Sequence, residues 1–421
     1  MKNKRDEMVC DTAVIGAGAS GMAAALACSK GKQRVFLFDR QEKMGRKILV
    51  TGNGKCNLTN QNQQKECYRS EIFGGAESVL EQFGLPETME LFRNLGLYLR
   101  ESNGYYYPYS EQAASVRDIF EEKILSNPSI AFYPKTQICQ VRARKKGFLL
   151  QDENRQSFVC KSLIVATGGF AGGPKLGCTG DGYAFAREMG HRLIRPLPAL
   201  TALKSSAPFL KKLSGVRNRA EILLKIDGKI AGKEKGELQW TDYGISGVAI
   251  FQLSRFAVVA LEKNQTVLLE MDFMPELSRK EKYELFVSLQ KSNRKKPMML
   301  FTKGFFPAKL CPVILREAGI APEEEAGSLT ETQWKNLVIA VSQFPLRMNG
   351  YLGYEKAQVT RGGVPFEELS DSLESKIHPG LFFTGEVVDV DGTCGGYNLQ
   401  WAFSSGSVAG KAAWERNQGE C

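Results

Sequence analysis

The sequence is poor in histidine and lacks any paired-cysteine motif. Only two of its 421 residues are histidine, His191 and His378, which excludes a histidine-based catalytic triad or metal site. The ten cysteines are scattered, and no C-x-x-C pair or zinc-like spacing occurs among them. This pattern is typical of small buried side chains in a reducing compartment. It predicts a cytoplasmic protein without a disulfide framework, a redox-active dithiol or a bound metal.

Long apolar runs are missing as well. No segment approaches the roughly 18 uncharged apolar residues of a membrane-spanning helix, so we expect no membrane association. With 43% hydrophobic and 24% charged residues, the composition is that of a globular chain, and its length is enough for two or three domains.

The net charge of +10 is spread along the chain. Small basic clusters lie at residues 142–146, 204–212 and 291–296, but none is an arginine-rich arm or alternates with aromatic residues. A solvated surface or an anionic small-molecule substrate is therefore favoured, and no nucleic-acid partner is expected. An RNA-modifying protein stays open as an alternative, which salt-sensitive binding of tRNA would support. The sequence does not decide between a monomer and a homo-oligomer.

The chain is organised around residues 9–39, which join an apolar run, a glycine-rich turn, a small-residue helix and a second apolar run. Within this unit Gly16 permits a tight turn, Gly18 lets the backbone approach a pyrophosphate, and Gly21 allows the helix to pack on the strand. The phosphates would lie on free N–H groups at the start of the helix, where Ala19 and Ser20 stand. A glycine-rich turn without a ligand is the alternative interpretation.

Asp39 ends the second apolar run, at about the spacing of ~20 residues where an acid accepts hydrogen bonds from ribose hydroxyls. A carboxylate there would repel a 2′-phosphate, which favours FAD or NAD over NADP as the bound dinucleotide. We also include the neighbouring Arg40 among the predicted cofactor-binding residues.

The next segment, residues 41–60, is dense in glycine, asparagine and threonine. Two of its cations are suited to phosphate, and its TGNGKCN backbone offers N–H groups to a flat ring system; a long surface loop is the alternative. The residues predicted here to contact the cofactor are Arg46, Lys47, Thr51, Gly52, Asn53, Cys56 and Asn57.

Two later segments again combine an apolar strand with a glycine-rich turn. An apolar strand ending in Ala-Thr-Gly-Gly is a frequent signature of two-dinucleotide-binding flavoproteins, which favours FAD over NAD. A buried strand at residues 380–386 and a glycine-rich loop at residues 391–398 lead into a helix whose dipole would stabilise negative charge on a reduced flavin. The cofactor-binding residues predicted from these elements are Ala166, Thr167, Gly168, Gly169, Gly385, Glu386, Gly395, Gly396, Tyr397 and Asn398.

The pattern of expected secondary structure changes near Pro196. Residues 196–274 contain short β-like runs with turn signals such as Asp227-Gly228, and residues 275–349 are mostly helical. Capping boxes are predicted at Ser278-x-x-Glu281 and Thr330-x-x-Gln333. Earlier in the chain, Thr179 or Asp181 is expected to cap a helix that runs to Met189.

We therefore predict an α/β protein with a Rossmann-like two-dinucleotide-binding FAD domain. This domain is discontinuous, formed by residues 1–195 and 350–421. Between its two parts, residues 196–349 form an inserted substrate domain that is β-rich over 196–274 and helical over 275–349.

The ordered motifs resemble those of the BaiN-like family of FAD-dependent oxidoreductases, whose members are aminoacetone oxidase-like flavoproteins or dehydro-bile-acid reductases. The resemblance covers most of the chain and rests on VIGAGASGMAAA, GRKILVTGNGKCNLTN, ATGGFAGGPKLGCTGDGYAFAREMGH, QWTDYGISGVAIFQLS, VTRGGV and FFTGEVVDVDGTCGGYNLQWAFSSG. It implies an FAD fold with an insertion, in which residues 45–57 and 392–400 lie against the flavin. Many relatives carry a histidine where this chain has Asp242, and a carboxylate replaces an imidazole as acid and base only if its pKa is raised.

The implied function is hydride transfer between flavin N5 and a small-molecule substrate held between the cofactor domain and the insertion. The leading prediction is a reductase that takes hydride from NADH or NADPH and saturates an activated C=C bond of an apolar carbonyl compound, such as a dehydro-steroid or bile-acid intermediate. An amine oxidase of the aminoacetone type is the alternative enzyme. The predicted catalytic residues are Asp242, Tyr243 and Tyr397, with residues 105–107 as further tyrosine proton donors.

Overall fold

The computed structural model describes residues 7–72 and 74–419, which form two compact units. Unit 1 consists of the described parts of Met1–Pro198 and Tyr354–Cys421, and unit 2 is Ala199–Gly353. The sequence boundaries expected after residues 195 and 349 differ from these by a few residues.

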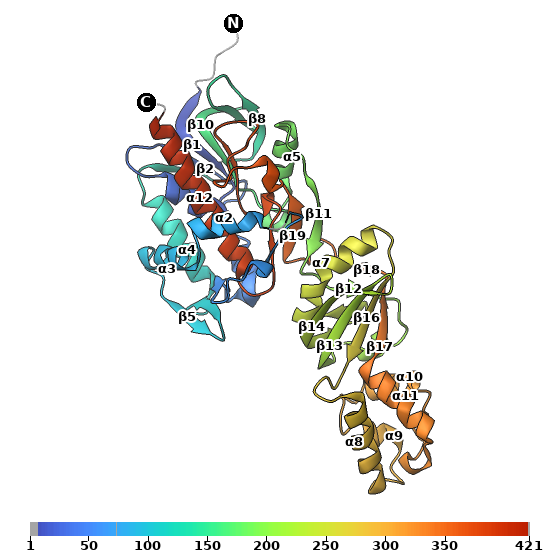
Figure 1. The fold of residues 1–421 in the computed structure, drawn as a ribbon. Helices are drawn as coiled ribbons and strands as arrows, with labels where there is room; N and C mark the ends of the chain where they lie inside the picture. Colours follow the sequence, from blue (N-terminus) through green and yellow to red (C-terminus); the bar gives the residue numbers. More distant parts are fainter. Residues whose placement is uncertain (1–6, 73, 420–421) are drawn as a thin grey trace. The chain divides into compact units, whose positions relative to one another are not determined.

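A seven-stranded, mostly parallel sheet forms the centre of unit 1 (Figure 1). Its strand order is β7-β2-β1-β10-β9-β8, and β20 pairs with the second half of β10. Pairs among β7, β2, β1, β10 and β20 are parallel, whereas β9 and β8 extend one side as antiparallel strands. The strands are β1 (Met8–Ile15), β2 (Val35–Phe38), β7 (Ile130–Tyr133), β8 (Ile138–Ala143), β9 (Phe148–Asp152), β10 (Ser157–Val165) and β20 (Leu381–Phe383). This confirms the predicted Rossmann-type α/β fold.

Two helices far apart in the sequence pack closely on each other beside this sheet. They are α1 (Ala19–Cys28) and α12 (Tyr397–Gly419). A Cβ built on Gly406 would lie 2.1 Å from the carbonyl oxygen of Ser20, and one on Gly410 would lie 2.5 Å from that of Ala24. The two main chains therefore touch, because glycine occupies the contact positions.

The remaining elements of unit 1 surround the sheet. The helices are α2 (Gly75–Gln82), α3 (Leu85–Asn94), α4 (Ala113–Leu125) and α5 (Asp181–Glu188), with 3-10 turns η1 (Ile48–Gly54), η2 (Lys65–Cys67), η3 (Pro174–Leu176), η5 (Phe366–Glu368) and η6 (Gly385–Val387). The short strands are β3 (Thr59–Asn60), β4 (Tyr68–Arg69), β5 (Leu99–Ser102), β6 (Tyr105–Pro108), β11 (Ile194–Ala199), β19 (Val359–Gly363) and β21 (Asp391–Gly392).

The predicted side-chain cap of α5 is wrong. Gly180, with φ +75°, precedes the helix, and the first-turn N–H of Gly182 donates to the hydroxyl of Thr167 (3.0 Å) instead. The hydroxyl of Thr179 instead donates to the carboxylate of Asp181 (2.9 Å), and the guanidinium of Arg40 bonds to both side chains. Because Arg40 engages these two oxygens, they are turned away from the helix terminus.

Unit 2 contains a second seven-stranded sheet, in the order β17-β16-β13-β14-β15-β12-β18, with antiparallel pairings throughout. Asp227 (φ +47°) and Gly228 (φ +79°) form the two-residue turn of its longest hairpin, which confirms the predicted turn, since type I′ turns require positive φ at both positions. The strands are β12 (Leu203–Lys204), β13 (Arg217–Ile226), β14 (Lys229–Trp240), β15 (Gly244–Ser246), β16 (Val267–Asp272), β17 (Phe344–Met348) and β18 (Gly350–Tyr351).

The helices of unit 2 include the predicted helical segment after residue 275. Both predicted capping boxes are present: Ser278 Oγ accepts from Glu281 N (3.3 Å), and Thr330 Oγ1 accepts from Gln333 N (3.2 Å). A 15-residue helix also interrupts the β-rich part. The elements are α6 (Leu210–Leu213), α7 (Val248–Glu262), α8 (Arg279–Lys291), α9 (Met298–Thr302), α10 (Cys311–Glu317), η4 (Ala326–Ser328) and α11 (Glu331–Ser342).

Within residues 7–72 and 74–419, every helix is too short or too polar to cross a membrane.

Replacing Gly406 with alanine is expected to destabilise unit 1, because the added Cβ would collide with the main chain of α1. We expect the free energy of unfolding to fall by about 2–3 kcal/mol, the upper part of the range for an overpacked core. Gly419→Ala is the control on the same helix, since a Cβ there meets no atom within 4 Å. Thermal unfolding followed by circular dichroism measures both variants, and equal melting temperatures would contradict the close contact.

Candidate functional site

A cavity in unit 1 lies at the carboxyl ends of the parallel strands β1, β2, β10 and β20, with the N-termini of α1 and α12 beside it. Its empty space is about 940 Å³, part of it open to solvent. Ligands bind at this edge of open α/β sheets. The predicted cofactor-binding residues that line it are Gly16, Gly18, Ala19, Ser20, Asp39, Arg46, Lys47, Thr51, Ala166, Thr167, Gly168, Gly385, Glu386 and Asn398.

The three glycines of the first turn occupy three different environments. A Cβ on Gly16 (φ +104°) would lie 2.5 Å from the carbonyl oxygen of Ala166, and one on Gly21 would lie 1.8 Å from that of Gly16. At both positions, neighbouring backbone atoms leave no room for a side chain. A Cβ on Gly18 would meet no atom within 4 Å, because this residue faces the cavity. The turn therefore fits a pyrophosphate that approaches the main chain at Gly18.

The N-terminus of α1 is open to an anion. No side chain caps the helix, and its first turn contains no acidic residue, so its leading N–H groups point toward the cavity without a carboxylate to compete. Lys43, Arg46 and Lys47 line the same cavity. The positive helix end and these cations suit a phosphate group.

Asp39 stands at the end of β2, where its carboxylate accepts hydrogen bonds from Ala17 N and Gln41 N, both 2.7 Å long. Burial raises the pKa of this carboxyl, while the two backbone hydrogen bonds and the charges of Arg40 and Arg46 oppose that shift. The two backbone contacts fix the carboxylate at the cavity edge.

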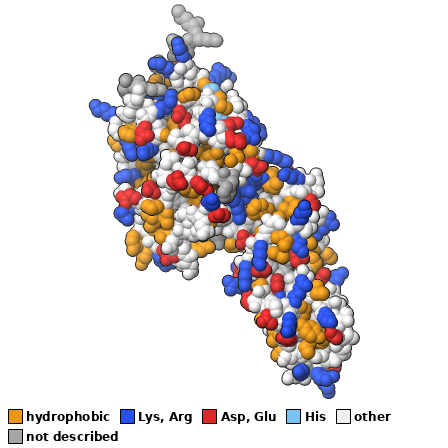
Figure 2. Space-filling view, in the orientation of Figure 1, with side chains coloured by type: hydrophobic (Ala, Val, Ile, Leu, Met, Phe, Trp, Pro, Cys, Tyr) orange, Lys and Arg blue, Asp and Glu red, His pale blue; other side chains and the backbone are white. Residues whose placement is uncertain are grey.

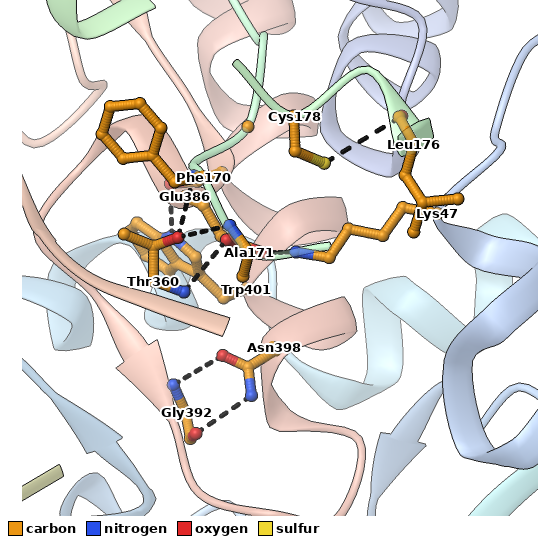
Figure 3. Close-up of polar contacts among 12 residues, drawn as sticks. Lys47, Phe170, Ala171, Leu176, Cys178, Thr360, Glu386, Gly392, Asn398 and Trp401 are labelled. Atoms are coloured by element: carbon orange, nitrogen blue, oxygen red, sulfur yellow. Dashed lines mark hydrogen bonds and ion pairs between the residues drawn. The ribbon is translucent and has the colours of Figure 1, made fainter. Parts of the chain in front are cut away.

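Lys47 and Glu386, both predicted from the sequence to contact the cofactor, form an ion pair with each other (Figure 3). The second carboxylate oxygen of Glu386 accepts from Thr360 N (3.2 Å), and the hydroxyl of Thr360 accepts from the N–H groups of Phe170 and Ala171 (2.9 Å each). This network joins the loop after β10, strand β19 and the turn after β20. Of its members, Lys47 and Glu386 line the cavity.

Asn398 enters the site from the first turn of α12. Its side chain accepts from Gly392 N (2.8 Å) and donates to Gly392 O (2.9 Å), as Figure 3 shows. The indole N–H of Trp401 donates to Gly385 O (3.0 Å). The start of the helix is thus held against both glycine-rich turns that precede it.

Several predicted cofactor residues do not line this cavity. Arg40 pairs with Asp181 at 2.7 Å, and Gly169 packs on Thr360. Gly52 and Asn53 are exposed in left-handed conformations. The full set outside the lining is Gly21, Arg40, Gly52, Asn53, Cys56, Asn57, Gly169, Gly395, Gly396 and Tyr397.

Part of this second set holds the segment after η1 against the start of α12. A Cβ on Gly396 would lie 2.7 Å from the main chain of Thr59 and 2.8 Å from the side chain of Asn57. Cys56 is buried, which raises the pKa of its thiol to about 11 and leaves it protonated at neutral pH. These residues support the cavity wall from behind.

The predicted catalytic residues fall in different units. Tyr397 is the first residue of α12; its buried ring lies edge-on to Tyr68, with 5.6 Å between ring centroids, and burial raises its phenol pKa above the ordinary value. Its hydroxyl therefore stays protonated at neutral pH. Asp242 and Tyr243 are exposed in the turn between β14 and β15 of unit 2.

The cavity also contains residues that were not among the individually predicted cofactor residues, although Gly45, Ile48 and Leu399 lie in the ranges 45–57 and 392–400 that the family resemblance implied. Gly45 (φ +64°) and Gly177 (φ +82°) lie in glycine-rich turns, which is a signal that could have found them. Burial raises the pKa of the Cys178 thiol, whose sulfur lies 4.0 Å from Leu176 O. The additional lining residues are Ala17, Gln41, Lys43, Gly45, Ile48, Leu176, Gly177, Cys178, Gln358, Leu399 and Ala402.

Comparison with known proteins identifies the family. The family model described as the HI0933-like protein Rossmann domain matches residues 10–412. The chain belongs to the HI0933-like family. A 3-dehydro-bile acid delta(4,6)-reductase from Clostridium scindens is 39% identical to it, over 96% of this chain and 98% of the relative.

Two further similarities place the chain among related proteins. A ribosomal RNA dihydrouridine synthase from Haemophilus influenzae is 32% identical over 93% of this chain and 95% of its own length. Among solved structures, the 3-ketosteroid-delta4-(5alpha)-dehydrogenase from Rhodococcus jostii RHA1 has a TM-score of 0.51 at 14% identity, covering 98% of each chain, and shares the fold. The resemblance drawn from the motifs is confirmed, and so is the predicted class of FAD-dependent oxidoreductase.

Gly18→Val is expected to lower the cofactor content of the HI0933-like chain while leaving the cofactor-free protein folded, because its side chain extends into open space. Bound flavin per protein should fall at least tenfold. Gly21→Val is the contrasting variant, since its side chain collides with Gly16 O and lowers the melting temperature itself. Absorbance of the purified proteins and thermal unfolding after flavin removal measure both effects; undiminished flavin in Gly18→Val would contradict the proposed phosphate position.

Proposed function

We propose that this protein reduces a C=C bond conjugated with a carbonyl group, and that its substrate is a dehydro-steroid or bile-acid intermediate. The observation that carries the proposal is the cavity lined by the glycine-rich turn and Asp39, in a chain 39% identical to a 3-dehydro-bile acid delta(4,6)-reductase along nearly its whole length. NADH or NADPH is the proposed electron donor.

The residues of unit 1 are suited to hold FAD. The N-terminus of α1 from Gly18 to Ser20 would bind the pyrophosphate, and Asp39 would accept from the ribose of the adenosine. The turn at Gly45, together with Lys47 and the start of α12, would lie along the rest of the cofactor. When bound, FAD supplies two-electron hydride transfer.

The reaction adds a hydride to the carbon β to the carbonyl and a proton to the α carbon, while the nicotinamide donor is oxidised. The protein must supply that proton and polarise the carbonyl oxygen. Tyr397 is our proposed proton donor in unit 1, because its phenol carries a proton at neutral pH and it begins the helix whose next residues line the cavity. Asp242 and Tyr243 are the proposed contributors from unit 2.

A second candidate substrate is the uracil base of RNA, whose C5=C6 bond is also conjugated with a carbonyl. One observation favours it besides the 32% identity to a ribosomal RNA dihydrouridine synthase. Residues 199–353 contain 23 Lys and Arg against 16 Asp and Glu, so unit 2 holds +7 of the net charge of +10. Such a bias suits a polyanionic substrate.

We expect anaerobic NADH or NADPH to bleach the oxidised-flavin absorbance rapidly. Subsequent addition of a 3-oxo-4-ene steroid or a 3-oxo-4,6-diene bile acid should restore that absorbance and yield the saturated product by mass spectrometry. The amine aminoacetone is the control substrate for an oxidase. Bleaching by aminoacetone but by neither nicotinamide would contradict the reductase and support the amine oxidase.

The Tyr397→Phe variant tests the proton donor. It should retain flavin and the rate of flavin reduction by the nicotinamide, and lose about 10²–10³-fold in the rate of steroid reduction, the usual range for a lost acid. Asp242→Asn is measured beside it over pH. Steroid reduction at the normal rate in Tyr397→Phe would remove Tyr397 from the mechanism, and an unchanged pH profile in Asp242→Asn would remove Asp242.

A further inference from the structure

Unit 2 has a groove of its own, separate from the cavity in unit 1. It lies between the segment around α6 and the start of α10, and has about 1420 Å³ of empty space open to solvent. The amine of Lys309 joins the two sides by donating to Ser214 O (3.4 Å). The residues that line the groove are Pro208, Phe209, Lys212, Lys309, Pro312, Val313, Arg316 and Glu317.

Some cations of unit 2 pair with carboxylates, whereas the three cations of this groove do not in the part of the chain that the structure describes. Along the sheet, Lys225 pairs with Glu270 at 2.7 Å and Lys233 pairs with Glu221 at 2.9 Å. Among the described residues, no carboxylate lies within ion-pair distance of Lys212, Lys309 or Arg316. All three are exposed, and Glu317 is the one acidic residue in the lining.

Phe209 gives the groove an aromatic element. Its ring is partly exposed and packs against the rings of Trp240 and Phe344, whose centroids lie 6.3 Å and 5.8 Å away. Pro208 and Pro312 add two rigid apolar surfaces. Cations that track a phosphate backbone, next to an aromatic ring on which a base stacks, are the combination used by proteins that bind single-stranded nucleic acid.

We propose that this groove binds a polynucleotide strand, with phosphates on Lys212, Lys309 and Arg316 and a base against Phe209. The charge bias of unit 2, visible as many Lys and Arg side chains on its surface in Figure 2, supports the choice of a polyanion. This proposal rests on the second candidate function, in which the protein reduces a uracil base of RNA. The groove would hold the strand that contains this base. It also departs from the expectation that the protein has no nucleic-acid partner.

The test is binding of a fluorescein-labelled oligouridylate to the full-length, flavin-loaded protein, measured by anisotropy at several salt concentrations. The variant K212A/K309A/R316A should bind at least tenfold more weakly, and the slope of log affinity against log salt should fall by about 2. The control is K229A/K263A/K291A, which removes the same charge from exposed, unpaired lysines of unit 2 outside the groove lining. It should keep most of the affinity and the slope.

Two further arms identify the occupant. Binding of DNA of matching sequence shows whether the groove selects RNA or accepts any phosphodiester strand. Binding to vesicles that contain phosphatidylserine tests a membrane surface as the occupant. Equal losses in the two triple variants, or binding to the vesicles without binding to the oligonucleotides, would overturn the proposal. Flavin content and nicotinamide-driven flavin bleaching are measured on the same samples: if both stay normal while oligouridylate does not bind, the groove proposal fails and the proposed reductase stands.

Discussion

The close approach of main chain to main chain at the carboxyl ends of the parallel strands is the constraint on which unit 1 depends. Gly16 leaves no room for a Cβ beside Ala166, Gly21 leaves none beside Gly16, and Gly406 leaves none beside Ser20. These contacts bring the turn after β1, the end of β10 and the helix α12 to one point, although they are separated by more than a hundred residues. Gly18, in the middle of them, keeps the free space that a pyrophosphate would need.

The polar groups around this point are tied to one another rather than left to solvent. Glu386 joins Lys47 to Thr360, and Thr360 in turn holds the N–H groups of the loop after β10. Asp39 is fixed by two backbone N–H groups. A site whose acceptors are positioned before a ligand arrives loses less entropy on binding, which explains how a wide, partly open cavity can retain a large cofactor.

The sequence predicts the parts of this site that have a local cause. Glycine spacing, an acid after the second strand and apolar runs ending in Gly-Gly or Gly-Glu are short-range patterns. Among the residues that they select, Gly16, Gly18, Asp39 and Glu386 line the cavity. The hairpin at Asp227-Gly228 and the two capping boxes follow for the same reason.

Other features follow from long-range packing, which the sequence does not display. Gln358 reaches the cavity only because the chain returns to unit 1 after the insertion, and Arg40 is turned away by Asp181, about 140 residues later. Asn57 and Gly396 carry a cofactor-like motif but pack on each other behind the wall. Lys212, the last residue of the basic cluster at 204–212, lines the groove together with Lys309 and Arg316, which the fold brings beside it.

The most direct test of the central claim is to release and identify the cofactor of the purified protein by denaturation and chromatography. The geometry of Gly18 and Asp39 predicts FAD at one molecule per chain, because an adenosine diphosphate half is what the turn and the acid are arranged to hold. It also predicts that Asp39→Ala retains little of it. Release of FMN alone, or full retention of FAD in Asp39→Ala, would contradict the assignment of this cavity.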